Sequence, residues 1–385
     1  IMADNNENKV LNVPHLRFPE FSGEWKKHSL GEIGETIIGL TYKPSDVVDN
    51  NGIIVFRSSN IKNGMIDYSD LVRVNKHIKD KIITKENDIL VCARNGSQRL
   101  IGKNAIIKQE DANNTFGAFM MVYRANDNPF ILPLLSTKKY FSQVGENLGA
   151  RINQITTSDF NGFEFYFPEN HAERTKIAEL FRLLDERIAT QNKIIEDLKK
   201  LKSAITDLLF HSIADAHTIR LGEIAHITNG AGDVQDANTE HQEDWYPFFD
   251  RSEELKWFPT YSFDKEAVIY AGEGQSFYPR YYNGKFALHQ RCYAITDFAS
   301  CIIPKYCYHF MNTLNSYFVR NSVGSTVPSL RMDIFQKVEI RLPPIPKQQH
   351  ICKIIDAFYT KLEVEQRGIS ILQELKQFLL SQMFI

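Results

Sequence analysis

Leu30-Gly-Glu-Ile33 returns 191 residues later as Leu221-Gly-Glu-Ile224. The same offset carries Gly39 to Gly230, so a glycine follows the motif at the same distance in both halves of the chain. Self-similarity over so long a period is typical of a duplicated structural unit rather than of a short repeat array. The repeat therefore predicts two copies of one globular unit within the 385 residues.

Each half closes with a strand-like segment that runs into proline, Phe163-Glu-Phe-Tyr-Phe-Pro168 and Val338-Glu-Ile-Arg-Leu-Pro343. A long helical pattern follows both segments, and the two patterns align without a gap at an offset of 174 residues. Ten apolar pairs in one register are too many for chance, so each globular unit is predicted to lead into a long helix. The matched pairs are Ile177/Ile351, Leu180/Ile354, Phe181/Ile355, Leu184/Phe358, Ile188/Leu362, Ile195/Ile369, Leu198/Leu372, Leu201/Leu375, Ile205/Leu379 and Phe210/Phe384.

Both helical patterns carry apolar residues at the alternating spacing of three and four that is typical of a helix–helix seam. They share polar interruptions, since Glu365 stands where Gln191 does and Lys376 where Lys202 does. About 36 residues give a rod of roughly 54 Å, longer than a small domain needs for its own packing. The two helices are therefore predicted to bury their stripes on each other, with packing on their own units as the alternative. The residues leave open whether the pair is parallel or antiparallel.

The composition is that of a globular protein, with 43% hydrophobic and 24% charged residues. The formal net charge of -2 excludes a uniformly basic partner of nucleic acid but not a local basic patch. No apolar run approaches the ~20 residues of a membrane helix, and the Asn-rich start does not resemble a secretory signal. Five cysteines without a C-x-x-C pair favour reduced, packed thiols. The chain is predicted to be cytoplasmic and not associated with a membrane.

The globular parts predict mixed strand and loop with short helices. Ile53-Ile-Val-Phe56 and Asp88-Ile-Leu-Val-Cys92 are predicted strands of the first half, and Ala267-Val-Ile-Tyr270 is its counterpart in the second. Asn63-Gly64 and Asn283-Gly284 are predicted to be turns between strands.

Basic residues gather in two windows that follow corresponding strands, residues 89–109 and 274–296, and neither window contains an acid. In contrast, residues 233–254 contain eight acidic residues and one basic residue, Arg251. Arginine, asparagine and glutamine side chains can read base edges, whereas lysine holds phosphates. Because the pattern occurs twice, it favours nucleic-acid binding over two solvated loops. The candidates are Arg94, Asn95, Gln98, Arg99 and Lys103 in the first window, and Gln275, Tyr278, Arg280, Tyr281, Tyr282, Lys285 and Arg291 in the second.

The sequence contains only partial matches to the catalytic and metal-binding motifs that it resembles. The segment from Gly96 to Asn104 departs from a P-loop in its glycine spacing and in having Asn104 where Ser or Thr should bind magnesium. Asn128-Pro129-Phe130 lacks the second proline of the amino-methyltransferase motif. Pro-Asp, the start of a common nuclease signature, does not occur, and no H-x-x-x-H pair is present. The sequence therefore predicts neither catalytic residues nor a metal site.

Several segments together resemble the specificity subunit of type I restriction-modification systems. They are Val13-Pro-His-Leu-Arg-Phe-Pro-Glu-Phe21 with Gly23-Glu-Trp25, the duplicated Leu-Gly-Glu-Ile, and Leu342-Pro-Pro-Ile-Pro-Lys-Gln-Gln349 ahead of the last helix. The resemblance covers nearly the whole chain. The first half departs from it, because Pro168-Glu169 stands where the second half has Pro343-Pro344.

The resemblance implies an α+β fold, in which two target recognition domains, related by the internal repeat, are separated by two long helices that form an antiparallel coiled coil. The expected parts are an N-terminal segment (1–24), the first domain (25–172), a central helix (173–214), the second domain (215–346) and a C-terminal helix (347–385). Double-stranded DNA, methyltransferase (modification) subunits, expected to be two, and a restriction/translocase subunit are the implied partners. S-adenosylmethionine, ATP and magnesium are expected on those partners and no cofactor on this chain.

The resemblance also adds candidate DNA-binding residues. Arg57 with Ser58 and Ser59, and Arg251 with Ser252, occupy matching places and are expected to hold the DNA backbone. The loops of Arg151 and of Ser325 and Thr326, ahead of each exit strand, are further candidates. The predicted function is non-catalytic recognition of a bipartite, asymmetric DNA site. A coiled-coil scaffold that binds protein and a single-chain DNA-modifying enzyme are the alternatives.

Overall fold

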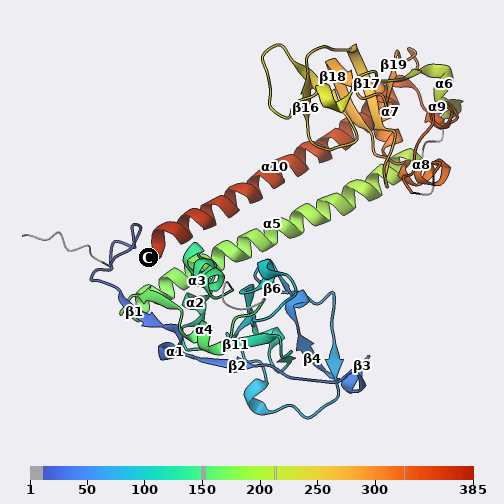
Figure 1. The fold of residues 1–385 in the computed structure, drawn as a ribbon. Coiled ribbons are helices and arrows are strands. Elements are labelled where there is room, and N and C mark those ends of the chain that lie inside the picture. Colours follow the sequence, from blue (N-terminus) through green and yellow to red (C-terminus); the bar gives the residue numbers. More distant parts are fainter. Residues whose placement is uncertain (1–11, 149–152, 212, 214, 325) are drawn as a thin grey trace, which may run out of the picture. The chain divides into compact units, whose positions relative to one another are not determined.

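The computed structural model describes residues 12–148, 153–211, 213, 215–324 and 326–385, which divide into two compact units. Unit 1 consists of the chain up to Asn192 together with Gly368–Ile385, and unit 2 consists of Lys193–Arg367. The two long helices, α5 (His171–His211) and α10 (Ile345–Met383), each run without interruption and contribute a part to both units (Figure 1). The predicted long helices are therefore confirmed.

Unit 1 is built from short strands and short helices, three of which, α2 to α4, lie between β11 and β12 (Figure 1). Its elements ahead of α5 are β1 (Lys26–Ser29), α1 (Leu30–Ile33), β2 (Glu35–Ile38), β3 (Val47–Val48), β4 (Ile53–Phe56), β5 (Ile61–Lys62), β6 (Met65–Ile66), β7 (Arg73–Val74), β8 (Ile89–Cys92), β9 (Asn104–Ile106), β10 (Thr115–Phe116), β11 (Met120–Arg124), α2 (Asn128–Leu134), α3 (Lys138–Leu148), α4 (Thr157–Asn161) and β12 (Glu164–Phe167).

Unit 2 repeats this order with fewer and longer strands. Between α5 and α10 it contains β13 (His217–Arg220), α6 (Leu221–Ile224), β14 (His226–Asn229), β15 (Tyr246–Phe249), β16 (Lys256–Phe258), β17 (Phe263–Ala271), β18 (Arg280–Leu288), β19 (Cys292–Thr296), α7 (Pro304–Met311), α8 (Asn315–Asn321), α9 (Met332–Gln336) and β20 (Glu339–Leu342). The predicted strands coincide with β4, β8 and part of β17. The mixed α/β composition and the internal duplication are confirmed.

The duplicated Leu-Gly-Glu-Ile motif forms the first short helix of each unit, α1 and α6. Its leucine is fully buried in both copies, which contributes about 2 kcal/mol. The backbone N–H groups of Leu30 and Leu221 donate to the carbonyls of Phe163 and Val338, just ahead of β12 and β20. A side chain on the following glycine would press against Asn161 in one unit and Gln336 in the other. The motif is repeated because this contact between the start and the end of each unit is repeated.

The two units share a strand order, although unit 1 breaks one strand in two. Besides the two-stranded pair β13-β20, the described part of unit 2 has a six-stranded sheet in the order β14-β19-β17-β18-β15-β16, with β18 antiparallel to β17 and parallel to β15. The described part of unit 1 has two four-stranded sheets instead, β2-β11-β8-β9 and β10-β4-β7-β3, besides the two-stranded pairs β1-β12 and β5-β6. Strands β9 and β10 correspond to the two parts of β18, separated by a 3₁₀ turn at Gln109–Asp111.

One predicted turn is correct and the other is wrong. Asn63 and Gly64 both have positive φ and connect β5 to β6, as predicted. Asn283-Gly284 instead lies in the middle of β18, where the two residues pair with Glu266 and Lys265 of β17. Pairing continues on both sides of the dipeptide, and glycine is tolerated within a strand because it can absorb the unusual φ of +132°. The connection between β17 and β18 is instead made by residues 272–279.

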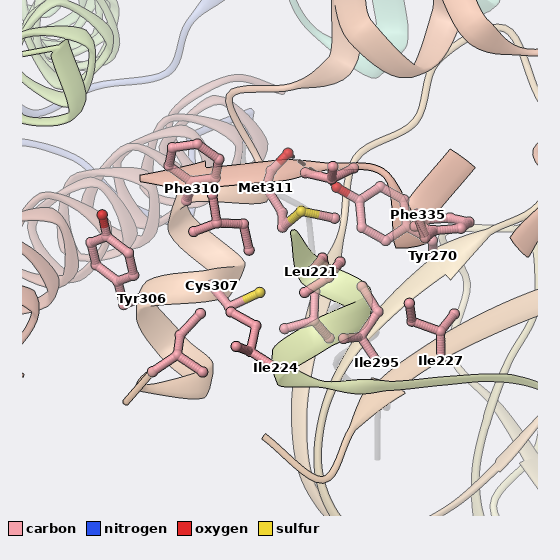
Figure 2. Packing of buried hydrophobic residues seen from close by; sticks show 14 of the residues in the cluster. Leu221, Ile224, Ile227, Tyr270, Ile295, Tyr306, Cys307, Phe310, Met311 and Phe335 are labelled. Carbon is pink, nitrogen blue, oxygen red and sulfur yellow. Dashed lines mark hydrogen bonds between the residues drawn. The ribbon is translucent and has the colours of Figure 1, made fainter. Parts of the chain in front are cut away.

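The core of unit 2 joins its sheet to its helices (Figure 2). Leu221 and Ile224 of α6 pack beside Cys307 and Met311 of α7. The hydroxyl of Tyr270, on β17, donates to the carbonyl of Met311 at 3.0 Å, which ties the sheet to α7. Unit 1 has a corresponding core around Trp25, Leu30, Tyr123 and Phe160. Each core therefore fixes the sheet whose loops carry the candidate residues.

The two long helices pair antiparallel within each unit. In unit 1, Phe181 of α5 contacts Phe384, which directly follows α10. Asp185, one turn further along α5, pairs with Lys376 of α10 at 2.5 Å, and Lys376 precedes Phe384 by about two turns. In unit 2, the ammonium group of Lys202 on α5 lies 4.0 Å from the ring centroid of Tyr359 on α10. Lys202 and Lys376 are the polar interruptions that the sequence repeats, and each contacts the opposite helix. The antiparallel direction implied by the resemblance is confirmed.

A buried histidine predicts a pH-dependent stability of unit 2. His309 of α7 is only 2% exposed, and its Nε2 lies 2.9 Å from Oδ1 of Asp356. Burial lowers the pKa of His309, and the Asp356 carboxylate opposes this shift only in part. The unfolded chain then binds a proton that the folded unit does not, so stability is expected to fall as the pH drops below about 6.5. Thermal unfolding between pH 8 and 5 measures the effect, and an unchanged pH slope in His309→Gln would contradict it.

Candidate nucleic-acid interface

The loops after β8 and after β17 carry the first candidate residues of the two basic windows, Arg94 and Gln275, and these loops occupy the same place in each unit. Ala93 N–H donates to the Phe119 carbonyl at 3.0 Å, and Gly272 N–H donates to the Arg291 carbonyl at 2.9 Å. The carbonyls of Ala93 and Gly272 in turn accept from Ile155 and Leu330, ahead of α4 and α9. The two loops, which the sequence predicts to be equivalent, thus make the same backbone hydrogen bonds in both units.

In unit 1, three of the candidate residues come together around an open hollow of about 850 Å³. Arg57 follows β4, and Arg94 and Asn95 follow β8. Tyr42, Ser58, Ser59, Asp70, Gly96, Phe119 and Asn153 are among the other residues that line it. Loops from six separate stretches of the chain therefore form one concave surface, with both apolar and hydrogen-bonding groups.

The polar groups of this hollow are held by their neighbours. Nη2 of Arg57 pairs with Oδ2 of Asp70 at 2.8 Å, so this arginine is neutralised within the unit. The amide of Asn95 donates to Ser58 Oγ at 2.9 Å and accepts from the backbone N–H of Ser97 at 3.0 Å. The guanidinium carbon of Arg94 lies 5.2 Å from the ring centroid of Phe119. These contacts order the surface before any ligand binds.

The remaining candidates of the first window lie outside the hollow. Gln98 and Arg99 are exposed on a 3₁₀ turn, Gln98–Leu100, and Lys103 is half-buried just ahead of β9. Arg99 has no hydrogen-bond or ion-pair partner within the described parts of the chain. Its guanidinium is therefore available to a ligand.

The candidates of unit 2 differ in how far their side chains are already engaged. Arg251, Gln275, Tyr278 and Thr326 are exposed. Arg280 donates to the Ser252 carbonyl, and the ammonium group of Lys285 lies over the Tyr261 ring. Arg291 pairs with Glu273 at 2.9 Å while remaining largely exposed.

Two adjacent tyrosines of β18 are engaged within unit 2. Tyr281 donates its hydroxyl to the carboxylate of Glu266 and packs against Tyr308 of α7. Burial and the Glu266 carboxylate raise the pKa of Tyr281 well above its usual range. Tyr282 packs between Phe249 and Phe286. Both remain predictions as DNA contacts, and Tyr281 would have to give up its bond to Glu266 to donate elsewhere.

A model of the type I restriction modification DNA specificity domain matches this chain twice, at residues 22–200 and 214–377. The chain belongs to this family. Its two specificity domains are the two copies that the internal repeat predicts.

Curated relatives carry the same description. Over 165 residues, 43% of this chain, it is 31% identical to the type I restriction enzyme EcoDI specificity subunit of Escherichia coli. Over 193 residues, 47% of the chain, it is 28% identical to the EcoKI specificity subunit of Escherichia coli strain K12. The matches span 36% and 41% of these relatives' own lengths, which is less than half of either.

The fold is similar to that of solved specificity subunits. The S subunit of a type I restriction-modification system from M. genitalium has a TM-score of 0.65 and 18% identity, covering 97% of this chain and 99% of that chain. A chain from a study of complex assembly in a type I restriction-modification system has a TM-score of 0.55 and 16% identity, covering 96% and 99%. At these identities the likeness shows the fold alone.

The structure corrects one equivalence between the specificity domains. The backbone N–H groups of Gly117 and His289, which follow the strand segments parallel to β4 and β15, donate to the carbonyls of Phe56 and Phe249. Arg57 therefore corresponds to Asp250, and Arg251 corresponds to Ser58. The predicted match of Arg57 with Arg251 is off by one residue, because the Arg-Ser dipeptide comes one position later in the second domain than in the first. Arg151 and Ser325 lie outside the described residues.

Several residues that line the hollow of the first specificity domain were missed, chiefly Tyr42, Phe119 and Asn153. Phe119 is 60% exposed although it lies between β10 and the buried strand β11. The sequence gives no signal for it, because an aromatic residue ahead of an apolar strand more often belongs to the core. Asn153 enters through a backbone bond, its carbonyl accepting from Asn95.

The described residues do not form a metal centre, and the environments of Cys92 and Cys292 do not activate their thiols. No group of three or more His, Cys, Asp or Glu side chains in these ranges could hold a metal ion. Burial raises the pKa of the Cys92 and Cys292 thiols to about 11, which disfavours a nucleophilic thiolate there. Among the helices of the described ranges, none has the length and apolar composition to span a membrane.

Proposed function

We propose that this chain is the DNA sequence-recognition subunit of a type I restriction-modification complex. In this proposal each specificity domain reads one part of a bipartite, asymmetric site in double-stranded DNA. The chain carries no catalytic residue of its own. Methyltransferase (modification) subunits and a restriction/translocase subunit act at the recognised site, and they carry S-adenosylmethionine, ATP and magnesium.

The observation that carries the proposal is a shared backbone with exchanged charges at corresponding positions. Arg57 pairs with Asp70 in the first domain, whereas Asp250, at the corresponding position, pairs with Lys256 at 2.6 Å in the second. If both copies of the duplicated domain recognised the same ligand, they would not need side chains of opposite charge at corresponding positions. Two domains that read different base pairs do need such differences, because each base pair presents its own pattern of hydrogen-bond donors and acceptors.

The charge distribution supports contact with base edges supplemented by phosphate contacts. Arg94, Asn95, Gln98, Arg99 and Gln275 supply the donors and acceptors that suit base edges, and Lys103 and Lys285 suit phosphates. The net charge of -2 predicts weak non-specific affinity for the isolated chain. Tight binding is therefore expected only in the assembled complex.

The test is DNA binding and site-specific methylation by this chain assembled with its modification subunits. Arg99→Ala is expected to weaken recognition of one half-site by about 1–3 kcal/mol and to leave the other unchanged. Sequencing of the methylated positions in a random DNA pool measures both half-sites at once. Loss of affinity on all sequences would instead indicate a phosphate contact at Arg99. The complete absence of salt-dependent DNA binding would favour a protein-binding scaffold, and methylation by the chain alone would favour a single-chain enzyme.

Exposed apolar rows on the long helices support the proposed protein partners. Leu201 and Leu208 of α5, in unit 2, are 49% and 65% exposed. In unit 1, Ile371 and Phe378 of α10 form a second row at the same spacing of seven residues. Large apolar side chains that form an exposed row on a helix, rather than standing singly, are typical of a surface that binds a protein partner.

Leu201→Glu with Leu208→Glu is therefore expected to weaken assembly with a modification subunit at least tenfold, while the isolated chain stays folded. Co-purification and analytical ultracentrifugation measure the assembly. Ser203→Glu, at an exposed position of the same helix, adds a charge outside the row and serves as the control. Equal assembly of both variants would show that the row does not bind the partner.

A further inference from the structure

At one pair of corresponding positions, each domain has an arginine, but on a different member of the pair. The pairing of β8 with β11 aligns Cys92 with Met120, and the pairing of β17 with β19 aligns Ala271 with Cys292. Counting outward from these pairs, Arg94 corresponds to Glu273, and Phe119 corresponds to Arg291. The backbone bonds of the two loops agree with this register, because Phe119 and Arg291 both accept from the loop residue opposite them.

Each domain places one guanidinium at this location, but the two arginines stand on opposite members of the pair. In the first domain Arg94 follows β8, and its guanidinium lies over the Phe119 ring at 5.2 Å. In the second domain Arg291 precedes β19, and its Nη1 bonds the Glu273 carboxylate at 2.9 and 3.1 Å. An aromatic face and a carboxylate are the two groups that orient a guanidinium most effectively.

The surroundings of Arg94 suit a base edge better than a phosphate. Within the described lining of the hollow, Arg57 and Asp70 neutralise each other, and Arg94 has no carboxylate partner. Asn95 and Asn153 add neutral amides rather than further positive charge. A phosphate site gathers cations, whereas bidentate recognition of guanine needs one oriented guanidinium beside neutral donors and acceptors.

Arg291 is also an oriented guanidinium in surroundings without excess positive charge, but a carboxylate rather than an aromatic ring orients it. Its Glu273 partner removes most of the net charge that would attract a phosphate. Only Nη1 is used in that contact among the described residues, and the side chain is largely exposed, so the remaining guanidinium donors are accessible to a ligand.

We propose that Arg94 and Arg291 each read a guanine in one half-site, and that Phe119 and Glu273 are the positioning residues that orient them. The inference rests on the proposed function and adds to it the base class and the reading residue of each domain. The Phe119 backbone carbonyl accepts the bonds of Ala93 and Arg94 whatever the side chain is. Substitution of Phe119 therefore tests the ring separately from the loop.

The experiment uses this chain assembled with its modification subunits and a random DNA pool, with methylated sites sequenced. Arg94→Lys keeps the positive charge but loses the bidentate fork, so preference for guanine at one position of the first half-site is expected to fall roughly 5- to 150-fold. Arg291→Lys is expected to do the same at one position of the second half-site. In each variant the unaltered half-site is the internal control.

The positioning role is tested by two substitutions of Phe119. Phe119→Leu is expected to lower the guanine preference roughly 2- to 5-fold at the position read by Arg94, because the ring that orients the guanidinium is lost. Phe119→Tyr keeps an aromatic face and is expected to retain the preference. Both variants are expected to unfold at the wild-type temperature, since the side chain is largely exposed.

The outcomes separate this inference from the proposed function. If the unaltered complex methylates DNA without sequence preference, the proposed function fails. If it is specific but Arg94→Lys and Arg291→Lys keep every base preference, the inference alone is refuted. A uniform loss of affinity on all sequences would also refute it, because that is the behaviour of a phosphate contact. Equal guanine preference in Phe119→Leu and Phe119→Tyr would overturn the role of the ring.

Discussion

Gly39→Ala is expected to destabilise the first specificity domain by about 3 kcal/mol or more. An added Cβ would lie 2.3 Å from the Gly117 carbonyl oxygen and 2.4 Å from that of Phe116. The contact is with backbone, and the Phe116 carbonyl is already held by the N–H of Leu40 at 2.7 Å. Neither group can move aside as a flexible side chain would.

Chemical denaturation of the full chain measures the effect, and the second half offers a parallel test. In Gly230→Ala the Cβ would lie 2.0 Å from the Leu288 carbonyl oxygen, so the second domain is expected to lose stability similarly. Gly145→Ala in α3 is the matched control, because nothing lies within 4 Å of its added Cβ. That variant is expected to keep or gain up to about 1 kcal/mol. Similar unfolding of Gly39→Ala and Gly145→Ala would show that the β2 connection tolerates a side chain.

The glycine pair illustrates what the sequence alone could predict. Gly39 and Gly230 match at one offset because the same close backbone approach occurs in both domains, and such a requirement leaves a direct trace in the residues. The long helices were equally predictable, since α5 and α10 each bury one apolar stripe with a regular period. Features that depend on local constraints and occur in both halves of the chain can therefore be predicted from the sequence alone.

The composition of the candidate site was less predictable because it depends on contacts between distant segments. Arg94 was identified from its basic window, but Phe119 enters only through the pairing of β8 with β11. The equivalence of Arg57 with Asp250 depends on the register of two parallel strand pairs, and a similarity between short sequences pointed to Arg251 instead. Asn283-Gly284 has the composition of a turn but lies within β18, because its neighbours on both sides continue to pair with β17.

Lengthening both helices by seven residues is expected to change the spacing between the two half-sites that the complex recognises. Suitable points are between Asn192 and Lys193 in α5 and between Arg367 and Gly368 in α10, where the chain passes from one compact unit to the other. Seven residues are close to two helical turns, so the apolar stripe of each helix keeps its face. The added length is about 10 Å, which corresponds to roughly three base pairs of B-DNA.

Methylation mapping on DNA pools with variable spacers measures the preferred distance. The base preferences within each half-site are expected to stay as they are, because neither globular part is altered. An insertion in α5 alone is the control: the contacts Lys376–Asp185 and Lys202–Tyr359 could then no longer form in one register, and the chain is expected to lose stability without gaining a new preferred spacing. A constant preferred spacing in the double insertion, with both half-sites still recognised, would show that the helices do not set the distance between the half-sites.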